Sequence, residues 1–239
     1  MPNSLGKADT ADVERHGSGA FSDDGCAVEV YARLPVGDDA RLIHELASPG
    51  DSILDLGAGV GRIADPLAAL GHHVVAVDNS ADMLAHVSGA EPVLSSIEAL
   101  RLADTFDVVL LASHLVNTPD ADLRHALLRT VAFHLAPHGR AFVEWHPPDW
   151  FDGLTPGQTY AGRIGSLETA LEVTSAAFDR VSATVRYQAD DLTWSQSFTA
   201  QRLSHDAVQS EFASVGLVLV GDSGMAPSWI VAQRTERLR

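Results

Sequence analysis

The sequence predicts an α/β domain built on a mostly parallel sheet, and two apolar runs joined by a glycine-rich loop carry the prediction. Ile53–Leu56 is short, apolar and bounded by turn residues, as expected of a strand buried on both faces. Glycines follow at alternate positions, then a helical run, Arg62–Leu70, and a second apolar run, Val74–Val77, which ends at Asp78. This order of elements places a ligand at the carboxyl ends of the strands, where Asp78 can accept hydrogen bonds from ribose hydroxyls.

The spacing of the glycines separates two classes of cofactor that use this unit. Dinucleotide-binding proteins carry G-x-G-x-x-G, whose third glycine lets the helix pack closely on the strand. Here the glycines are Gly57, Gly59 and Gly61, and the sixth position is Arg62. With Asp55 two positions before the first glycine, the pattern resembles motif I of the class I S-adenosylmethionine-dependent methyltransferases, and a nicotinamide oxidoreductase is the weaker alternative.

The resemblance covers roughly residues 52–147 well and implies both a fold and a cofactor. The implied fold is a Rossmann-like class I methyltransferase sheet of seven strands, the last one antiparallel. The implied cofactor is S-adenosylmethionine, with S-adenosylhomocysteine as the product. The residues expected to bind it are Tyr31, Asp55, Gly57, Ala58, Gly59, Gly61, Asp78, Asn79, Met83, Ser96, Ile97, Glu98, Ala112 and Ser113.

Some of these positions carry alternatives. Tyr31 is expected to touch the methionine end of the cofactor or the substrate, or else to pack as a partly buried aromatic residue. Met83 resembles the residue that family members pack against the adenosine, and core packing is its alternative. Relatives commonly carry Asp-Ala-Glu-x-Leu where this chain reads Ser-Ile-Glu-Ala-Leu, so the adenine amino group meets the neutral hydroxyl of Ser96, with a share for Glu98, while Ile97 covers the ring.

Composition argues against several classes of function. The chain has 239 residues, a formal charge of -16 and Lys7 as its only lysine, so it lacks the clustered cations that bind nucleic acid. Its only cysteine, Cys26, cannot form an internal disulfide, which fits a reducing compartment. No apolar run approaches the roughly 20 residues of a membrane span, and the first residues lack a signal-peptide core. We therefore expect a cytoplasmic protein with a small-molecule substrate and no nucleic-acid or membrane partner.

The chain is expected to form a single domain over residues 1–239. Its beginning is polar and shows neither helical nor strand periodicity, which favours disorder. The expected parts are a disordered segment (1–22), an N-terminal lid segment (23–36), the cofactor-binding core (37–147), a β insert or lid (148–203), and the final helix and hairpin of the core sheet (204–239).

Capping residues and apolar spacing predict the helices. Asp38 and Asp39 suit the start of a helix that ends near Ala47. Pro66 should distort the first turn of the helix after the glycine loop or delay its start, because proline removes a backbone hydrogen bond. The remaining helices are expected to run over Ala81–His86 with Ser80 as cap, from Thr118 and Pro119 to Gly139, and from Ser204 to Gly216.

Apolar runs predict the remaining strands, and a change of period marks an insert. The runs lie at Pro92–Ser95, Phe106–Ala112 and Arg140–Trp145, with Leu217–Val220 and Ser228–Gln233 as a closing hairpin. After the fifth strand, alternation of apolar and polar residues predicts an antiparallel β insert with strands at 171–175, 181–188 and 192–200. Small-molecule methyltransferases carry such an insert as a lid or dimer surface, and this one looks similar, so a homodimer through the insert is a hypothesis.

Polar and aromatic residues follow the fourth and fifth strands, where the transferred methyl group is expected. His114 and His146 are candidate general bases, because histidine titrates near neutral pH; for each, a hydrogen-bonded structural role is the alternative. The residues expected to line an aromatic acceptor pocket are Tyr31, His114, Trp145, His146, Trp150 and Phe151, with core packing as the stronger reading of Trp145. Four other histidines, His72, His73, His134 and His138, are expected to be solvated, and no spacing indicates a metal site.

These observations predict methyl transfer from S-adenosylmethionine to a hydroxyl or amine of a small metabolite or natural-product intermediate. Such a transfer is an in-line displacement that benefits from proximity and from the exclusion of water. The alternative is a protein that binds S-adenosylmethionine without transferring methyl, and uses it for cyclisation or elimination or senses it as a ligand.

Overall fold

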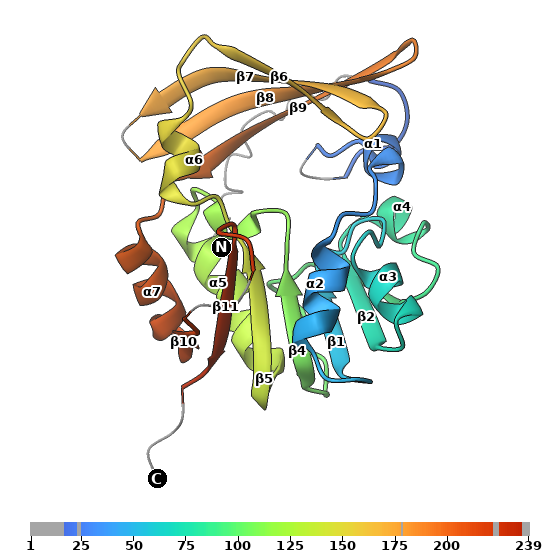
Figure 1. Cartoon of the computed structure of the whole chain (residues 1–239), viewed down its shortest axis with the longest axis vertical. Coiled ribbons are helices and arrows are strands. Elements are labelled where there is room, and N and C mark those ends of the chain that lie inside the picture. The colour runs from blue at the N-terminus through green and yellow to red at the C-terminus, as the bar shows by residue number, and fades with distance from the viewer. Residues whose placement is uncertain (1–16, 23–24, 178, 222–224, 236–239) are drawn as a thin grey trace, which may run out of the picture.

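A computed structural model describes residues 17–22, 25–177, 179–221 and 225–235. Figure 1 shows a large sheet covered by helices on both faces, and a smaller sheet that lies across the carboxyl ends of the large sheet's strands. We call the smaller sheet the lid. The described residues contain no helix that is long and apolar enough to cross a membrane.

The large sheet has the order β10-β11-β5-β4-β1-β2-β3, and its seven strands confirm the predicted fold class. Strand β11 pairs antiparallel with both of its neighbours, β5 and β10, while β1 to β5 run parallel. The strands are β1 (Ser52–Leu56), β2 (His73–Asp78), β3 (Glu91–Leu94), β4 (Phe106–Leu111), β5 (Leu135–Glu144), β10 (Leu217–Leu219) and β11 (Trp229–Arg234).

Most helices lie close to their predicted positions, although both ends of α5 differ from the prediction and α6 was not predicted. The delayed start that Pro66 predicts is confirmed, because α3 begins at Ala64. Helix α5 begins after Asp120, which accepts bonds from two backbone N–H groups, and not at Thr118. The helices are α1 (Val28–Arg33), α2 (Asp39–Leu46), α3 (Ala64–Ala69), α4 (Ala81–Leu84), α5 (Ala121–His134), α6 (Pro148–Asp152) and α7 (His205–Ser214), and a short 3-10 helix, η1 (Leu115–Asn117), follows β4.

The sequence predicted that Gly139 ends α5. In the structure Gly139 lies inside β5. A side chain there would come within 2.7 Å of the Asp107 carbonyl oxygen, so the glycine permits close approach of the neighbouring strand. The helix ends at His134 because the chain turns directly into β5. The glycine at this position is therefore explained by the close packing of the strands and not by the end of a helix.

Apolar side chains fill both faces of the large sheet. On one face, α5 and α7 pack Leu128, Val131 and Phe212 against the strands, each fully buried. On the other face, Ile43 of α2 and Leu67 of α3 are fully buried. Burial of each such side chain stabilises the fold by roughly 1.5–3 kcal/mol, so both helix layers hold the strand ends in fixed positions.

Two histidines that were expected to be solvated are buried. His134 is 0% exposed; its Nδ1 bonds the Thr130 carbonyl, and its Nε2 accepts a bond from Leu102 N. His72 is 6% exposed, and its Nε2 lies 2.8 Å from Nδ1 of His44. The prediction was wrong for both because hydrogen-bond partners, which the sequence does not reveal, make burial of an imidazole tolerable.

The lid is a four-stranded antiparallel sheet in the order β6-β7-β8-β9. Its strands are β6 (Thr159–Ile164), β7 (Leu167–Ala177), β8 (Arg180–Ala189) and β9 (Leu192–Gln201). The predicted insert is therefore present, although its first strand, β6, was not expected. Every residue of β6 is exposed, so it lacks the half-buried alternation that identified the others.

Apolar clusters fix the lid at its two ends. At one end, α1 contributes Val30 to a cluster with Leu167 and Trp194 of the lid. At the other, Phe151 of α6 packs against Val173 and neighbouring lid residues. Figure 1 shows α1 and α6 beneath opposite ends of the lid, so the lid forms a bridge over the carboxyl ends of β1, β4 and β5.

The predicted disordered segment 1–22 lies mostly outside the described residues. Its last part, residues 17–22, is described by the structure and contacts the lid. The Trp194 indole donates to the Ser18 carbonyl, and Phe21 pairs with Ala27 in a β-bridge. Tertiary contacts to the lid thus outweigh the weak local preferences of this polar stretch.

Candidate functional site

The glycine loop after β1 has a backbone that other residues rarely adopt. Gly57, Gly59 and Gly61 have φ angles of 76°, 56° and 83°, all in the left-handed region. The N–H groups of Gly57 and Ala58 both bond the carbonyl of Val77 on β2, which ties the loop to the neighbouring strand. The three glycines therefore shape one tight turn at the carboxyl end of β1.

Two carboxylates lie beside this turn. Asp78, at the end of β2, accepts bonds from Gly59 N and from Ser80 N, each at 2.8 Å. Asp55, within β1, is 2% exposed, and its Oδ1 has no hydrogen-bond partner among the described residues. Burial, and next the negative charge of Asp78, raise the pKa of Asp55 to about 7.

An unpartnered buried carboxylate oxygen is costly unless a ligand satisfies it. A cationic ligand with hydrogen-bond donors, such as the α-ammonium and sulfonium end of S-adenosylmethionine, would provide that partner. The loop and its two carboxylates, Asp55 and Asp78, therefore fit the cofactor that the glycine spacing implies.

The residues expected around the adenosine lie along the same edge. Ile97 and Leu115 flank Gly57, where a side chain would meet them at 3.5 Å and 3.0 Å. Ser96 is partly buried, whereas Asn79 and Glu98 are exposed. Ala112 is 6% exposed at the end of β4.

Two of the predicted cofactor residues lie under or within the N-terminal segment. Met83 is 3% exposed and packs against Cys26 and Val28, which favours the core-packing alternative. Tyr31 borders the same cluster, and its hydroxyl lies 3.2 Å from the Cys26 sulfur. Val60 of the glycine loop packs against this cluster, so α1 contacts the loop.

The chain makes a strained turn directly after β4. Ser113 and His114 have φ angles of 59° and 55°, a conformation that costs a residue other than glycine roughly 1–3 kcal/mol. The Ser113 N–H donates to Oε2 of Glu144 at 2.7 Å, and Oε1 of Glu144 lies 3.5 Å from Nε2 of His114. Glu144, the last residue of β5, thus stabilises the turn that presents His114.

His114, His146 and Trp150 form a stack of three rings. The His114 and His146 centroids are 3.7 Å apart, and those of His146 and Trp150 are 3.8 Å apart with planes at 9°. Phe151 meets Trp150 edge-on at 4.8 Å. Four residues of the predicted acceptor pocket are thus brought together from the ends of β4 and β5 and from α6; we call His114, His146 and Trp150 the ring stack.

The environment of the ring stack keeps both histidines neutral. Burial lowers the pKa of His114 to about 4. Burial, together with the nearby His114, lowers the pKa of His146 to about 3. Neutral rings can stack face to face without charge repulsion, and each can accept a hydrogen bond.

Trp145 does not belong to this pocket. It is 3% exposed in the core, its indole donates to the Pro227 carbonyl at 3.0 Å, and its ring contacts His205 of α7. Adjacent residues of a strand point to opposite faces, so Trp145 faces away from the side that Glu144 occupies. The stronger alternative, core packing, is correct for this residue.

Sequence reasoning missed Glu144, and it placed Asn117 after the fourth strand without assigning it a role. The signal for Glu144 was present, since a charged residue ends the apolar run of β5. Asn117 is 2% exposed and its amide bonds His146 N, His146 O and Gln201 O, which joins the ring stack to the base of the lid. No local pattern distinguishes such an asparagine from a loop residue.

The underside of the lid is mainly apolar. Leu171, Val185 and Gln196 are paired across β7, β8 and β9, so they lie in one row on one face. Each is an even number of residues along its strand from the residues that contact α1 and α6, so the row lies on the same face of the lid, between the two apolar clusters. Gln196 also donates to the Cys26 sulfur at 3.0 Å.

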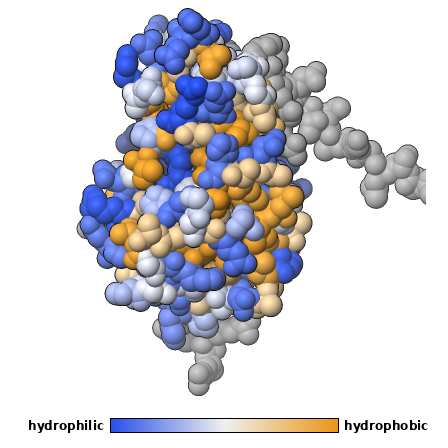
Figure 2. Space-filling view, turned by 90° about the vertical axis from the view of Figure 1, so that its right-hand side faces the viewer, coloured by the Kyte–Doolittle hydropathy of each residue, from blue (hydrophilic) through white to orange (hydrophobic). Residues whose placement is uncertain are grey.

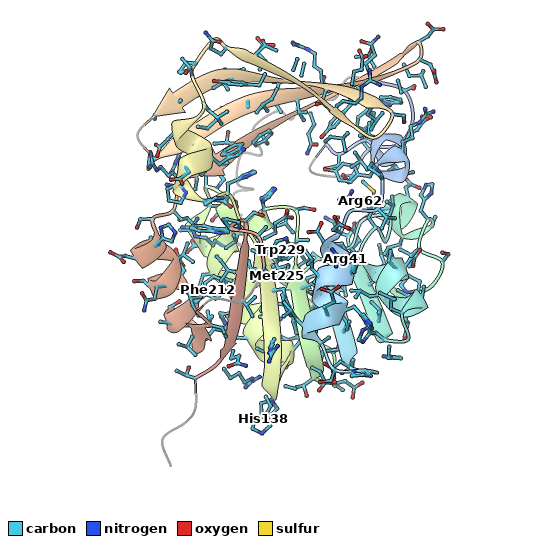
Figure 3. All side chains as sticks on the ribbon, viewed as in Figure 1. Arg41, Arg62, His138, Phe212, Met225 and Trp229 are labelled. Atoms are coloured by element: carbon cyan, nitrogen blue, oxygen red, sulfur yellow. The ribbon has the colours of Figure 1, made fainter. Side chains whose placement is uncertain are left out.

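Arg62 lies between α1 and the upper edge of the large sheet (Figure 3), and its guanidinium donates to the Pro35 carbonyl at 2.9 Å. It also borders a cavity of about 630 Å³ between α1, the glycine loop and α3. The lining of that cavity includes Tyr31 and Gly61 but not Asp78 or Ile97, so it contains only some of the expected cofactor residues.

Figure 2 shows hydrophobic residues gathered below the largely hydrophilic lid on this flank of the molecule. The described residues contain no group of three or more His, Cys, Asp or Glu side chains that could hold a metal ion.

Comparisons with known proteins agree with the geometry. Residues 53–139 match the protein family described as a methyltransferase domain. A segment of 109 residues is 37% identical to a cypemycin N-terminal methyltransferase from a Streptomyces species, and covers 43% of this chain and 44% of that protein. The match thus spans less than half of the relative's length.

Solved structures share the whole architecture. The CcbJ methyltransferase from Streptomyces caelestis is 21% identical, with a TM-score of 0.70 over 87% of this chain and 96% of that one. The sugar N-methyltransferase KedS8 from Streptoalloteichus is 15% identical, with a TM-score of 0.69 over 99% and 100% of the two chains. At these identities the similarity concerns the fold. Residues 53–139 thus match a methyltransferase domain, and the strand order and the glycine loop with its buried aspartate make this chain similar in fold to class I S-adenosylmethionine-dependent methyltransferases.

Proposed function

We propose that this protein transfers a methyl group from S-adenosylmethionine to an amine or hydroxyl of a small metabolite or natural-product intermediate. The observation that carries the proposal is the shared edge of the sheet. The unpartnered oxygen of Asp55 and the ring stack lie at the carboxyl ends of neighbouring strands, under one lid. A donor site and an acceptor site are thereby adjacent and covered.

The relatives support the small-molecule part of the proposal. Besides the sugar N-methyltransferase, similar structures include an amino pentose methyltransferase from Micromonospora echinaspora, with a TM-score of 0.64 over 83% of this chain and 89% of that one. Such acceptors are small enough to fit beneath a lid, and the acidic surface of this chain is unsuited to nucleic acid.

In the proposed complex, Asp55 and the glycine loop hold the cationic end of S-adenosylmethionine, and Asp78 receives the ribose hydroxyls. When bound, the cofactor supplies a methyl group activated by a sulfonium. Ile97 and Leu115, which flank Gly57, provide apolar cover for the adenosine.

The protein increases the rate by aligning the acceptor with the methyl group and by excluding water from the site. Holding an acceptor against the ring stack, opposite the glycine loop, makes the displacement effectively intramolecular, which is worth up to about 7–11 kcal/mol in favourable cases. The apolar row on the underside of the lid excludes water from the same space. Positioning is therefore sufficient for an acceptor that is already a nucleophile.

His114 and His146 remain the candidate bases for an acceptor that must lose a proton. Their lowered pKa values keep them neutral, and hence able to accept a proton, but reduce their strength as bases. The ring stack is therefore better suited to binding and orienting an acceptor than to deprotonating a weakly acidic one.

Calorimetry followed by mass spectrometry tests the proposal. We expect both S-adenosylmethionine and S-adenosylhomocysteine to bind the purified protein. Formation of S-adenosylhomocysteine should then depend on an added acceptor, drawn from peptides with free N-termini, amino sugars and phenols. If neither ligand binds, the proposal is refuted. If S-adenosylmethionine binds and breaks down without an acceptor, cyclisation or elimination is supported instead.

A homodimer through the lid remains a separate proposal. The outer face of the lid carries hydroxyl pairs, such as Ser182 with Thr199 and Thr184 with Ser197, and the ion pair between Arg186 and Glu172. A dimer through this face would be polar and salt-sensitive, which light scattering at low and high ionic strength would reveal.

A further inference from the structure

Glu144 is a carboxylate held at the centre of the acceptor side of the site. It is the last residue of β5, its side chain is 22% exposed, and it lies next to the turn that follows β4. One oxygen accepts the Ser113 N–H at 2.7 Å, which fixes the orientation of the group. The other oxygen faces His114 at 3.5 Å, beyond a short hydrogen bond, and can still receive a donor.

The surroundings of Glu144 leave its negative charge without a close cation. Its ion-pair contact among the described residues is His114, whose ring is neutral because its pKa is lowered to about 4. Burial raises the pKa of Glu144, and Asp39 at the start of α2 adds to this effect. The Ser113 N–H and the more distant Arg62 act in the opposite direction.

A half-buried carboxylate in such a place is stabilised by a ligand that carries its own positive charge. Nothing in the turn requires the charge for structural reasons, since a neutral amide oxygen would accept the Ser113 N–H equally well. The charge of Glu144 is therefore better explained by what enters the site than by what holds the fold.

The remaining walls define the rest of that ligand. The ring stack offers the edges and outer faces of planar rings, and Phe151 backs it. The row on the underside of the lid is apolar except for Gln196. A ligand with one cationic group and an adjoining apolar or planar part matches these three surfaces.

We infer, on the basis of the proposed function, that the methyl acceptor is a protonated amine carried on an apolar or planar group, and that Glu144 binds the ammonium and takes its proton. The proton moves from the ammonium nitrogen to a carboxylate oxygen of Glu144, which becomes a neutral acid. The freed lone pair forms the N–C bond as the C–S bond breaks, and the electron pair of that bond stays on sulfur. Glu144 then returns its proton to water as the product leaves.

Small probe molecules test this inference without knowledge of the natural acceptor. With the protein saturated by S-adenosylhomocysteine, the binding of benzylamine and of benzyl alcohol is measured by ligand-observed NMR. We expect benzylamine to bind at least about tenfold more tightly than benzyl alcohol, because only the ammonium pairs with the carboxylate. Failure of benzylamine to bind, or equal binding of the two probes, overturns the inference.

The variant Glu144→Gln keeps an acceptor for the Ser113 N–H and removes the charge. It should weaken benzylamine binding by about tenfold or more and leave benzyl alcohol and S-adenosylhomocysteine binding unchanged. Glu45→Gln is the matched control, because Glu45 lies on the exposed face of α2 and, among the residues that the structure describes, forms its ion pair with Arg41. Unchanged benzylamine binding in Glu144→Gln contradicts the role of the carboxylate.

The pH dependence of benzylamine affinity shows whether the charge of Glu144 binds the probe or whether Glu144 has only a structural role. Between about pH 8 and about pH 5, wild-type affinity for benzylamine should fall as Glu144 gains a proton, and Glu144→Gln should show no such fall. If Glu144→Gln does not fold, Glu144→Asp takes its place and must still prefer benzylamine over benzyl alcohol. If the wild-type protein does not bind S-adenosylhomocysteine, the proposed function itself is refuted. This result differs from a failure of the inference about Glu144, in which S-adenosylhomocysteine binds but benzylamine is not preferred.

Discussion

Replacement of Asp55 by asparagine should stabilise the unliganded protein at alkaline pH and weaken cofactor binding. Asp55 has a folded pKa of about 7, against 3.8 for the free side chain, because burial disfavours its charge. For a raised pKa, stability is fully present below the unfolded value and is lost as pH rises through the folded value. A difference of one in pKa corresponds to about 1.4 kcal/mol, so the ionised carboxylate destabilises the fold by a few kcal/mol at pH 8.

Thermal unfolding from about pH 5 to about pH 8 measures the first half of this prediction. The melting temperature of the wild type should include a component that falls across this window, and Asp55→Asn should lack that component. In a domain of this size about 1 kcal/mol corresponds to roughly 2–4 °C, so the variant should melt several degrees higher at pH 8. Asparagine has nearly the shape of aspartate, which keeps the cavity filled.

Calorimetric titration with S-adenosylmethionine measures the second half. If the ionised carboxylate is what binds the cation, the wild-type affinity should rise by about tenfold between pH 6 and pH 8 as a group with a pKa of about 7 ionises. The affinity of Asp55→Asn should be lower and should not change over the same range.

Asp107→Asn is a control variant whose effect on stability at alkaline pH should be opposite to that of Asp55→Asn. The hydrogen bonds from Ser52 lower the pKa of Asp107, which lies at the other end of the sheet from the glycine loop. Its replacement should slightly reduce stability at pH 8 and leave cofactor binding unchanged. A lower melting temperature for Asp55→Asn than for the wild type at pH 8, or an affinity of Asp55→Asn that rises with pH as the wild type's does, would refute the reasoning.

Three further predictions concern the backbone and the ring stack. Gly59→Ala should weaken S-adenosylmethionine binding at least tenfold by calorimetry, whereas Gly50→Ala should not, although both have positive φ and neither side chain would meet an atom within 4 Å. Asn117→Ala should reduce the free energy of unfolding by about 2–4 kcal/mol in urea titrations, because it leaves buried partners unsatisfied. The double change of His114 and His146 to alanine should lower turnover mainly through a higher KM in steady-state assays, if the rings orient the acceptor; an unchanged KM with a lost kcat would indicate proton transfer instead.

The cofactor half of the site was predictable from the sequence because its signals are local. Glycines at alternate positions specify a turn, and the carboxylates Asp55 and Asp78 lie at fixed distances from it along the chain. Strand burial then fixes which edge of the sheet they occupy. The resemblance to a family added the cofactor's identity to a geometry that the residues already implied.

The acceptor half was predictable only in part. His114, His146 and Trp150 were expected near one another, but not as a stack, and Trp145, a candidate for the pocket wall, packs in the core because a strand end can turn either face inward. Glu144 and Asn117 act through contacts with residues 31 and 84 positions away, respectively, which no sequence pattern records. Contacts between residues far apart in the sequence, and not local secondary-structure propensity, determine the arrangement of the acceptor half of the site.

The acidic groups at the carboxyl edge of the sheet give one account of how the two halves work together. Asp55 and Glu144 both have raised pKa values for the same reason, namely burial without a close cation. A sulfonium beside Asp55 and an ammonium beside Glu144 would bring two positive charges close together, which opposes simultaneous binding. In the proposed reaction, transfer of the ammonium proton to Glu144 would remove one of these charges from the acceptor. The carboxylate then relieves the repulsion and creates the nucleophile in the same step, which a neutral ring stack alone could not do.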